Sequence, residues 1–295
     1  MGLSKIYMAG SGGMLGEAFY EKFKLSHKIK CTDIDVNEDW LSYLDFREFE
    51  KYEKDVNEFN PNWLFHIGAY TDLEYCEKNE EDTYDTNTKS VKNAVKIANK
   101  LYISTAGIFD GEKEVYDESD APNPMCHYAK SKYLGEEYVI NYSKNYLICR
   151  AGWMMGGGPR KDKKFIHKIM KQIKAGQKEL FIVNDKLGTP TYTHDFALNV
   201  KLLIDKDQRG KFNMVCSDLT SRIDVATELL CILNLNNKIK ITEVNSDFFA
   251  KEYFALRPDC ERLINKKLND LNLNIMRKWK TALKEYINNY YDDYL

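Results

Sequence analysis

The feature that most constrains the fold of this chain is a glycine-rich loop that directly follows an apolar stretch near the N-terminus. The run KIYMAG (5–10) is typical of a buried strand, and AGSGGMLG then places Gly10, Gly13 and Gly16 three residues apart at the start of an amphipathic helix. Glycines at such a turn let the backbone approach a pyrophosphate, which the helix N-terminus stabilises with free N–H groups and its dipole. The loop therefore predicts a dinucleotide-binding site, with a ligand-free turn as the alternative. We expect its cofactor contacts at Gly10, Gly13, Met14 and Leu15.

Apolar and amphipathic runs alternate through the first half of the chain. After the first strand, strands are expected at residues 28–34, 62–69, 101–107 and 146–153, and helices at residues 14–25, 44–59, 87–100 and 128–142. Strands that alternate with helices indicate βαβ units, and therefore a doubly wound parallel (Rossmann) sheet with helices on both faces. Beyond Trp153 the segments are shorter and less regular, which predicts a smaller mixed α/β C-terminal domain.

The expected domain boundaries follow from this change of pattern. Residues 1–152 are expected to form the dinucleotide-binding domain, with residues 182–221 returning to it. Residues 153–181 and 222–295 are expected to form a substrate domain.

The composition excludes several classes of protein. The 295 residues carry a net charge of −2, and a nucleic-acid partner would usually require a basic surface. No apolar run is long enough for a membrane span, and the N-terminus lacks the pattern of a secretory signal. The seven cysteines are scattered, odd in number and without a C-x-x-C pair, which fits a reducing compartment. We therefore predict a cytoplasmic protein with no nucleic-acid partner, no membrane partner and no metal site.

Two acids follow the second expected strand, which ends in CTDID. An acid at this position usually bonds the adenosine ribose hydroxyls of NAD. Asp33 is the better placed of the two and Asp35 is the alternative, while a solvated acidic loop would bind nothing. No arginine follows closely to accept a 2′-phosphate, so NAD is favoured over NADP.

The stretch HYAKSKYLGEE (127–137) places a phenol and an ammonium on one face of an expected helix, because Tyr128 and Lys132 are four residues apart. A neighbouring ammonium lowers the pKa of a phenol from its ordinary value of about 10, which suits it to acid–base work. A hydroxyl at the end of the neighbouring strand would hold a substrate oxygen, and ISTAG provides Ser104 and Thr105 there. The tyrosine–lysine spacing alone is common on surface helices, so its meaning depends on the glycine loop and on this strand end.

Several segments spread over nearly the whole chain are more specific in combination than any one of them. They are PNWLFHIGAYTDLEYCE, NTKSVKNAVKIA, ISTAGIFDG, YAKSKYLGEE, ICRAGW, LGTPTYTHDFA, ALRPDCERL and IMRKWKTALKEYI. Together they resemble the extended short-chain dehydrogenase/reductases, and within them the dTDP-4-dehydrorhamnose reductases. The resemblance implies a reductase that uses NADH or NADPH on the C4 ketone of a nucleotide-linked 4-keto-6-deoxy sugar, with dTDP-4-dehydrorhamnose and dTDP-L-rhamnose as substrate and product.

The resemblance also implies roles for individual residues. Thr105 corresponds to the catalytic hydroxyl, Tyr128 to the general acid and Lys132 to its ribose-binding helper. The segment that passes beneath the cofactor corresponds to Gly68, Ala69, Tyr70 and Thr71, with Thr71 facing the substrate. Asp45 and Phe46 correspond to residues at the adenine edge.

Three further correspondences have equally good structural alternatives. Asn87 matches a helix asparagine or caps a helix. Trp153 lines the sugar pocket or is a core aromatic. Arg257 meets the substrate diphosphate, which an arginine fork suits, or forms a surface ion pair.

The chain departs from the family in three places. Ala106 and Gly107 stand where the family has Asp-Tyr, and that tyrosine borders the substrate, so the pocket is expected to be wider or differently walled. The segment MMGGGPRKDKK (154–164) is unusually basic and covers a diphosphate or forms a solvated loop. Cys260 and Glu261 occupy a stretch where the family usually has serine.

These departures leave other functions open. A reductase or an epimerase of another nucleotide-sugar is one alternative, whereas a dehydratase would need an acidic pair that Ala106 and Gly107 lack. A cofactor-binding regulatory subunit, such as the relative that partners methionine adenosyltransferase, is the other. Some family members require magnesium and dimerise through acidic residues. We find no such site in this sequence, and a homodimer is possible by resemblance alone. Asp292 and Asp293 are interpreted as part of an exposed terminus.

Overall fold

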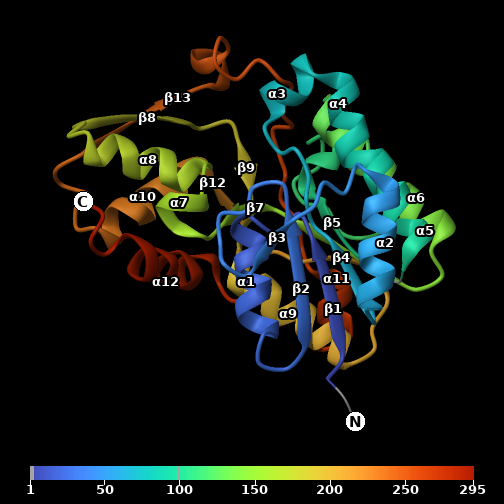
Figure 1. Ribbon diagram of the computed structural model, residues 1–295. Helices are drawn as coiled ribbons and strands as arrows, with labels where there is room; N and C mark the ends of the chain where they lie inside the picture. Colours follow the sequence, from blue (N-terminus) through green and yellow to red (C-terminus); the bar gives the residue numbers. More distant parts are fainter. Residues whose placement is uncertain (1–2, 99) are drawn as a thin grey trace.

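A seven-stranded parallel sheet forms the centre of the computed structural model, which describes residues 3–98 and 100–295 (Figure 1). Its strands are β1 (Lys5–Ala9), β2 (Lys28–Asp33), β3 (Leu41–Tyr43), β4 (Trp63–His66), β5 (Lys100–Thr105), β6 (Tyr146–Ala151) and β11 (Gly210–Asn213). They lie in the order β11-β6-β5-β4-β1-β2-β3, so the direction of winding reverses between β1 and β4. Ligands of open α/β sheets bind at such a reversal, outside the carboxyl ends of the strands. The predicted doubly wound parallel sheet is confirmed.

Two layers of helices cover the sheet because successive strand residues point to opposite faces. On β1, Ile6 and Met8 join the core beneath α1 and α9, while Tyr7 and Ala9 pack on the other side with α2 and α5. The helices are α1 (Met14–Phe23), α2 (Phe49–Phe59), α5 (Ser90–Ile97), α6 (His127–Tyr142) and α9 (Thr193–Asp205). Figure 1 shows α2, α5 and α6 together on one side of the sheet.

The C-terminal part of the chain forms a small mixed α/β lobe beside the carboxyl ends of the strands (Figure 1). Its strand pairs are β7 (Trp153–Met155) with β10 (Pro190–Tyr192), β8 (Glu179–Val183) with β13 (Lys240–Val244), and β9 (Leu187–Gly188) with β12 (Thr220–Ser221). Its helices are α7 (Gly158–Lys161), α8 (Phe165–Lys174), α10 (Arg222–Ile232), η3 (Ser246–Phe249) and α12 (Trp279–Tyr291), while α11 (Lys266–Asp270) packs against β11. One hydrophobic cluster runs from α1 and α9 into this lobe, so the two parts share a core. The domain boundaries stay a prediction.

Short elements fill the region between β4 and α6. They are α3 (Leu73–Lys78), α4 (Glu80–Tyr84), the π-helical turn η1 (Asp85–Lys89) and the 3₁₀ turn η2 (Ala106–Ile108). None of the described helices is both long and apolar enough to cross a bilayer.

Several expected boundaries differ from the observed ones. The helix expected at 44–59 begins only at Phe49, because the residues before it form β3 and then turn Leu44 and Phe46 into the core. The helix expected at 87–100 consists of part of the π turn and α5, and residue 99 lies outside the described residues. The loop expected at 154–164 contains the end of β7 and the short helix α7.

Candidate active site

The glycine loop after β1 packs tightly on one side and is open on the other. Gly10 has φ +74°, and a Cβ there would lie 2.2 Å from the Cα of Gly68. A Cβ at Gly16 would lie 2.0 Å from the carbonyl oxygen of Ser11. Gly13 caps the N-terminus of α1, and no described heavy atom comes within 4 Å of a Cβ built on it. The loop therefore leaves room at Gly13, beside Met14, where a phosphate would meet the free N–H groups of α1.

The segment after β4 lies directly against this loop. A Cβ at Gly68 would lie 2.4 Å from Cε1 of Phe46 and 2.8 Å from the Cα of Gly10. Glycines are required here because the two backbones and the Phe46 ring occupy the space of any side chain. Three of the predicted cofactor-binding positions, on three separate loops, are thus brought together.

Asp33 closes the loop from the end of β2. Its Oδ2 accepts a hydrogen bond of 2.7 Å from the N–H of Gly12, and its Oδ1 accepts one of 2.9 Å from the N–H of Asp35. The side chain of Asp35 is exposed. Asp33 is therefore the acid held against the glycine loop, and Gly12, which we had not singled out in the sequence, is the residue that holds it.

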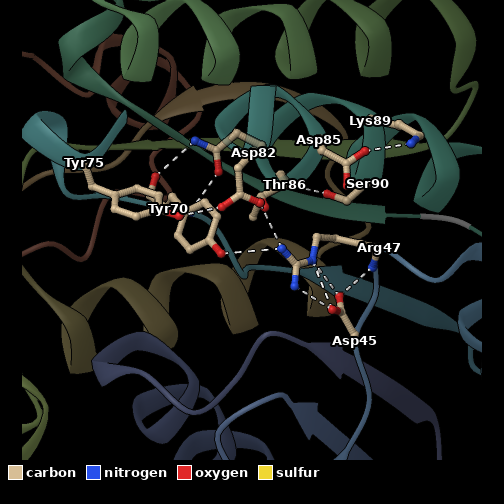
Figure 2. A network of polar contacts seen from close by, with 10 residues as sticks. Asp45, Arg47, Tyr70, Tyr75, Asp82, Asp85, Thr86, Lys89 and Ser90 are labelled. Carbon is tan, nitrogen blue, oxygen red and sulfur yellow. Dashed lines mark hydrogen bonds and ion pairs between the residues drawn. The ribbon is translucent and has the colours of Figure 1, made fainter. Parts of the chain in front are cut away.

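Asp45 belongs to a polar network centred on Arg47 (Figure 2). The Arg47 guanidinium donates to both carboxylate oxygens of Asp45, at 2.7–3.0 Å, and pairs with Asp82 of α4 at 3.1 Å. It also reaches the Tyr70 hydroxyl at 3.5 Å, and the Tyr75 hydroxyl donates to Asp82 at 2.5 Å. The Arg47 hydrogen bonds hold the pKa of Asp45 below its ordinary value. Arg47 was missed by the sequence motifs, and it ties the loop after β3 to α4.

Asn87 connects the cofactor segment to α6. This side chain is 1% exposed and lies within the π turn η1, where it caps no helix. Its Oδ1 accepts from the N–H of Tyr70 at 2.8 Å, and its Nδ2 donates to the carbonyl of Tyr70 at 3.0 Å and to the Ser131 hydroxyl at 3.1 Å. Single π turns often mark functional sites in helices. Because Ser131 lies between Tyr128 and Lys132, this one amide sets the position of the tyrosine–lysine face relative to residues 68–70.

Thr105 and Tyr128 come together at the carboxyl end of β5, and Lys132 lies one turn further along α6, over the ring of Tyr102 on β5. Tyr128 in the first turn of α6 is half-buried, and the Thr105 hydroxyl lies near enough to its phenol to lower the pKa of that phenol. Thr105 also accepts a hydrogen bond of 3.2 Å from the N–H of Gly107. Ser104, the alternative hydroxyl, is fully buried one residue earlier on the strand. The geometry therefore favours Thr105 over Ser104 as the partner of Tyr128.

Burial dominates the electrostatics of this trio. It raises the pKa of the Tyr128 phenol, against the opposing effect of the Thr105 hydrogen bond. Burial also lowers the pKa of Lys132 to about 7, and the Glu136 carboxylate opposes that fall. Lys132 is 4% exposed, with its ammonium 4.4 Å from the centre of the Tyr102 ring. The lowered Tyr128 pKa that we expected from Lys132 is not found: burial is the largest influence on this phenol, and Lys132 is not among the main groups that shift its pKa.

The wall opposite α6 contains a carboxylate. A Cβ at Gly107 would lie 3.2 Å from Oε1 of Glu261 and 3.6 Å from Oγ1 of Thr105. The indole N–H of Trp153 donates to Oε2 of Glu261 at 2.8 Å. The guanidinium of Arg222 lies 3.6 Å from the centre of the Trp153 ring, and burial lowers its pKa to about 10. Glu261 and Trp153 therefore lie beside Gly107, and the wider or differently walled pocket stays a prediction. Arg222 lies against Trp153, and no sequence motif had indicated it.

Arg257 forms the ion pair that the sequence left open as an alternative. Its guanidinium makes two bonds, of 2.7 and 2.8 Å, to the carboxylate of Glu74 on α3. In Figure 1 the chain before Arg257 runs past α3. Arg257 thus joins the C-terminal lobe to α3.

The basic segment 154–164 lies across the start of α1. A Cβ at Gly157 would lie 2.9 Å from the Cβ of Met14. Lys161 pairs with Glu17 at 3.1 Å and with Glu38 at 2.8 Å. Two other side chains of the segment also reach across: Arg160 pairs with Glu38, and Lys164 donates to the exposed Thr71. Most of its cations are therefore paired within the protein, and Lys163 is exposed.

The described residues offer no group of three or more His, Cys, Asp or Glu side chains that could hold a metal ion. A groove of about 960 Å³ runs along α4 and η1 towards Leu134 of α6. It contains none of the predicted site residues, so it does not mark the position of the chemistry.

Comparisons with known proteins agree with this arrangement. Residues 4–292 match the RmlD substrate binding domain family. The chain is similar to the solved structure of a dTDP-4-dehydrorhamnose reductase from Clostridium acetobutylicum, with 32% identity, a TM-score of 0.87 and coverage of 96% of this chain and 98% of that one. It is also similar to the structure of that reductase from Bacillus anthracis in complex with NADP, with 25% identity, a TM-score of 0.87 and coverage of 98% and 100%.

One curated relative carries a different name. Methionine adenosyltransferase 2 subunit beta from Danio rerio is 24% identical over 282 residues, which cover 88% of this chain and 84% of that protein. The family match nevertheless spans almost the whole chain, and the resemblance predicted from the motifs is confirmed. The chain belongs to the RmlD substrate binding domain family, the dTDP-4-dehydrorhamnose reductase family of the extended short-chain dehydrogenase/reductases.

Proposed function

We propose that this protein reduces the C4 ketone of a nucleotide-linked 4-keto-6-deoxy sugar, with dTDP-4-dehydrorhamnose as the first candidate substrate and dTDP-L-rhamnose as the product. The observation that carries the proposal is the link through Asn87, which joins the Tyr128–Lys132 face to the segment packed on the glycine loop. This link supports a single site that would hold both a proton donor and a dinucleotide.

In this proposal the nicotinamide cofactor, when bound, supplies the hydride for C4. Tyr128 gives its proton to the ketone oxygen, and the Thr105 hydroxyl orients that oxygen. A phenol with a raised pKa is fully protonated at neutral pH, so it carries the proton that the ketone oxygen receives, and the same rise makes it a weaker acid. Lys132 holds the ribose, and in its charged form it stabilises the phenolate left after proton transfer.

The residues present suit a dinucleotide. Gly10, Gly13 and Gly68 give the close backbone approach and the open space that a pyrophosphate needs. Asp33 would face the adenosine ribose and would repel a 2′-phosphate, which favours NADH over NADPH. The NADP complex of the Bacillus anthracis relative supports the other choice, so we propose that either cofactor is used, with NADH preferred.

A screen of cofactor oxidation tests the proposal. NADH and NADPH are each mixed with the wild-type protein and a panel of 4-keto-6-deoxy sugar nucleotides made by upstream dehydratases, and absorbance at the reduced nicotinamide band is followed. The expected result is oxidation with at least one of these ketones. No oxidation with any of them, by protein that binds the cofactor, would overturn the proposal.

A regulatory subunit is the second candidate, supported by the similarity to the Danio rerio subunit. Such a protein would bind the cofactor, would reduce no ketone of the panel, and would co-purify with another enzyme. The intact Thr105, Tyr128 and Lys132 trio favours the reductase. An epimerase would instead carry a tightly bound nicotinamide, which the ultraviolet spectrum of the purified protein would reveal.

A further inference from the structure

The carboxylate of Glu261 stands beside the reacting groups with one of its oxygens unused. Trp153 donates to Oε2, whereas no described donor or cation bonds to Oε1. A single Cβ at Gly107 would touch both Oε1 of Glu261 and Oγ1 of Thr105, at 3.2 and 3.6 Å. The free carboxylate oxygen and the hydroxyl that orients the substrate therefore border the same small space.

The second carboxylate oxygen is open to a further donor. Glu261 is half-buried, and a donor on a bound ligand would exchange the hydration of Oε1 for a hydrogen bond to a charged acceptor. The neighbouring Arg222 stacks on Trp153, and the Glu261 charge acts on its guanidinium at longer range, with no ion pair or hydrogen bond between these two side chains in the described part of the chain. The Trp153 hydrogen bond fixes the direction of the carboxylate, which is the pre-organisation expected of a binding group.

We propose that Glu261 is a specificity-determining residue that accepts a hydrogen bond from a donor on the sugar carbon next to the reacting carbonyl. The donor is a hydroxyl or an ammonium group, since both offer a proton to a carboxylate. This inference rests on the proposed function, because that function places the substrate carbonyl at Thr105. Glu261 acts on selection of the substrate and takes no part in proton transfer.

Gly107 is part of the same arrangement as Glu261. Its backbone has no positive φ, so a larger residue would be tolerated conformationally, but its Cβ would press on Oε1 of Glu261. The absence of a side chain at residue 107 therefore makes space for a carboxylate that arrives from a distant part of the chain.

The test compares Glu261→Ala and Glu261→Gln with wild type on matched substrates. The substrates are 4-keto sugar nucleotides that carry a hydroxyl, an amine or only hydrogen on the carbon next to the ketone. Wild type is expected to favour one of the two donor-bearing substrates over the deoxy one by roughly 10- to 100-fold in kcat/KM, the scale of a buried hydrogen bond to a charged group. Glu261→Ala is expected to bring this ratio to within about threefold of unity.

The Gln variant separates the two donors. If the donor is a hydroxyl, the amide oxygen still accepts its hydrogen bond and most of the preference survives. If the donor is an ammonium group, loss of the negative charge removes most of the preference. Glu252→Gln, an exposed carboxylate on the same stretch of chain, serves as the control and should match wild type. Equal losses on donor-bearing and deoxy substrates in Glu261→Ala would overturn the role of Glu261.

A binding experiment keeps this inference separate from the proposed function. Calorimetry with the reduced sugar nucleotides, with and without the donor, needs no turnover. If wild type oxidises no cofactor with any ketone, the proposed reaction falls, yet a donor preference that disappears in Glu261→Ala still supports Glu261. If wild type binds the sugar nucleotides with and without the donor equally well, the proposal that Glu261 recognises this donor is wrong, whether or not the protein catalyses the reduction. Thermal melting of each variant shows that the fold is intact.

Discussion

The two walls of the candidate site are held in different ways. On one wall, Tyr128 and Lys132 project from α6, and the backbone of this helix is bonded at Ser131 by Thr88 and at Lys132 by Tyr102, with distances of 2.8 and 2.9 Å. On the opposite wall, Trp153 and Glu261 are 108 residues apart and meet through one side-chain hydrogen bond. Backbone hydrogen bonds also hold Trp153 to Thr189 and Glu261 to Leu187, at 2.9 and 2.8 Å. The comparison teaches that the wall on α6, the fixed wall, carries its two predicted catalytic side chains on one helix, whereas the opposite wall depends on a contact between two side chains from distant segments.

The largest expected effect comes from removing the proposed proton donor from the fixed wall. Tyr128→Phe keeps the ring and deletes the hydroxyl, so kcat is expected to fall by about 10²- to 10⁴-fold, the usual contribution of a general acid. Steady-state kinetics on a confirmed substrate measures it. Tyr142→Phe, at the exposed end of the same helix, should leave kcat unchanged. Turnover of Tyr128→Phe within a fewfold of wild type would show that another group delivers the proton.

The next prediction concerns a substitution that weakens the anchoring of α6 and leaves the proposed catalytic residues unchanged. Asn87→Ala removes three hydrogen bonds and leaves the N–H of Tyr70 without its acceptor, while the Ser131 hydroxyl keeps its bond to the Tyr128 carbonyl. The free energy of unfolding is expected to fall by about 1–3 kcal/mol, which is the cost of an unsatisfied buried polar group. Urea denaturation measures this change. We also expect kcat to fall and the KM for the cofactor to rise. Asn79→Ala, on the exposed α3–α4 junction, is the matched control; equal stability of Asn87→Ala and wild type would contradict the anchoring role.

Titration of Lys132 gives a smaller, pH-dependent effect. Its pKa is lowered to about 7, so the fraction of charged Lys132 falls as the pH rises through that value. If the ammonium supports proton donation, kcat/KM for reduction should be level below about pH 6 and fall tenfold per unit above about pH 8, since this parameter reports the free protein. The Tyr128 phenol has a raised pKa and stays protonated throughout this window. Lys132→Arg should lose the inflection because arginine does not titrate there; an unchanged descending limb would assign it to another group.

The fixed wall could largely be predicted from the sequence, because its determinants are local. The spacing of Gly10, Gly13 and Gly16 after an apolar run identified the loop, and the four-residue spacing of Tyr128 and Lys132 placed both on one face of a helix. What local spacing could not give was the anchoring of that face. Asn87 bonds to Ser131, 44 residues away, and a π turn leaves no simple pattern of apolar residues.

The opposite wall could not be predicted from the sequence, because the residues that form it are far apart in the chain. The sequence predicted that Ala106 and Gly107 leave space, but the side chain that borders this space comes from residue 261. Arg222 reaches Trp153 from the first turn of α10, after a strand of only two residues. The direction in which the Tyr128 pKa shifts also depends on how deeply the phenol is buried, and the spacing of Tyr128 and Lys132 does not determine that burial.

The smallest expected effect tests whether the opposite wall acts as one unit. Gly107→Ala adds a single methyl group whose carbon would lie 3.2 Å from Oε1 of Glu261, so the carboxylate must shift by a few tenths of an ångström. We expect KM for a donor-bearing sugar to rise roughly threefold with kcat unchanged, because the lost interaction is one of binding. In a Glu261→Ala background the same methyl group meets no carboxylate and should change nothing, and such non-additivity is the signature of direct contact. If Gly107→Ala raised KM equally in both backgrounds, the methyl group would be acting through Thr105, and the two walls would be coupled rather than separate.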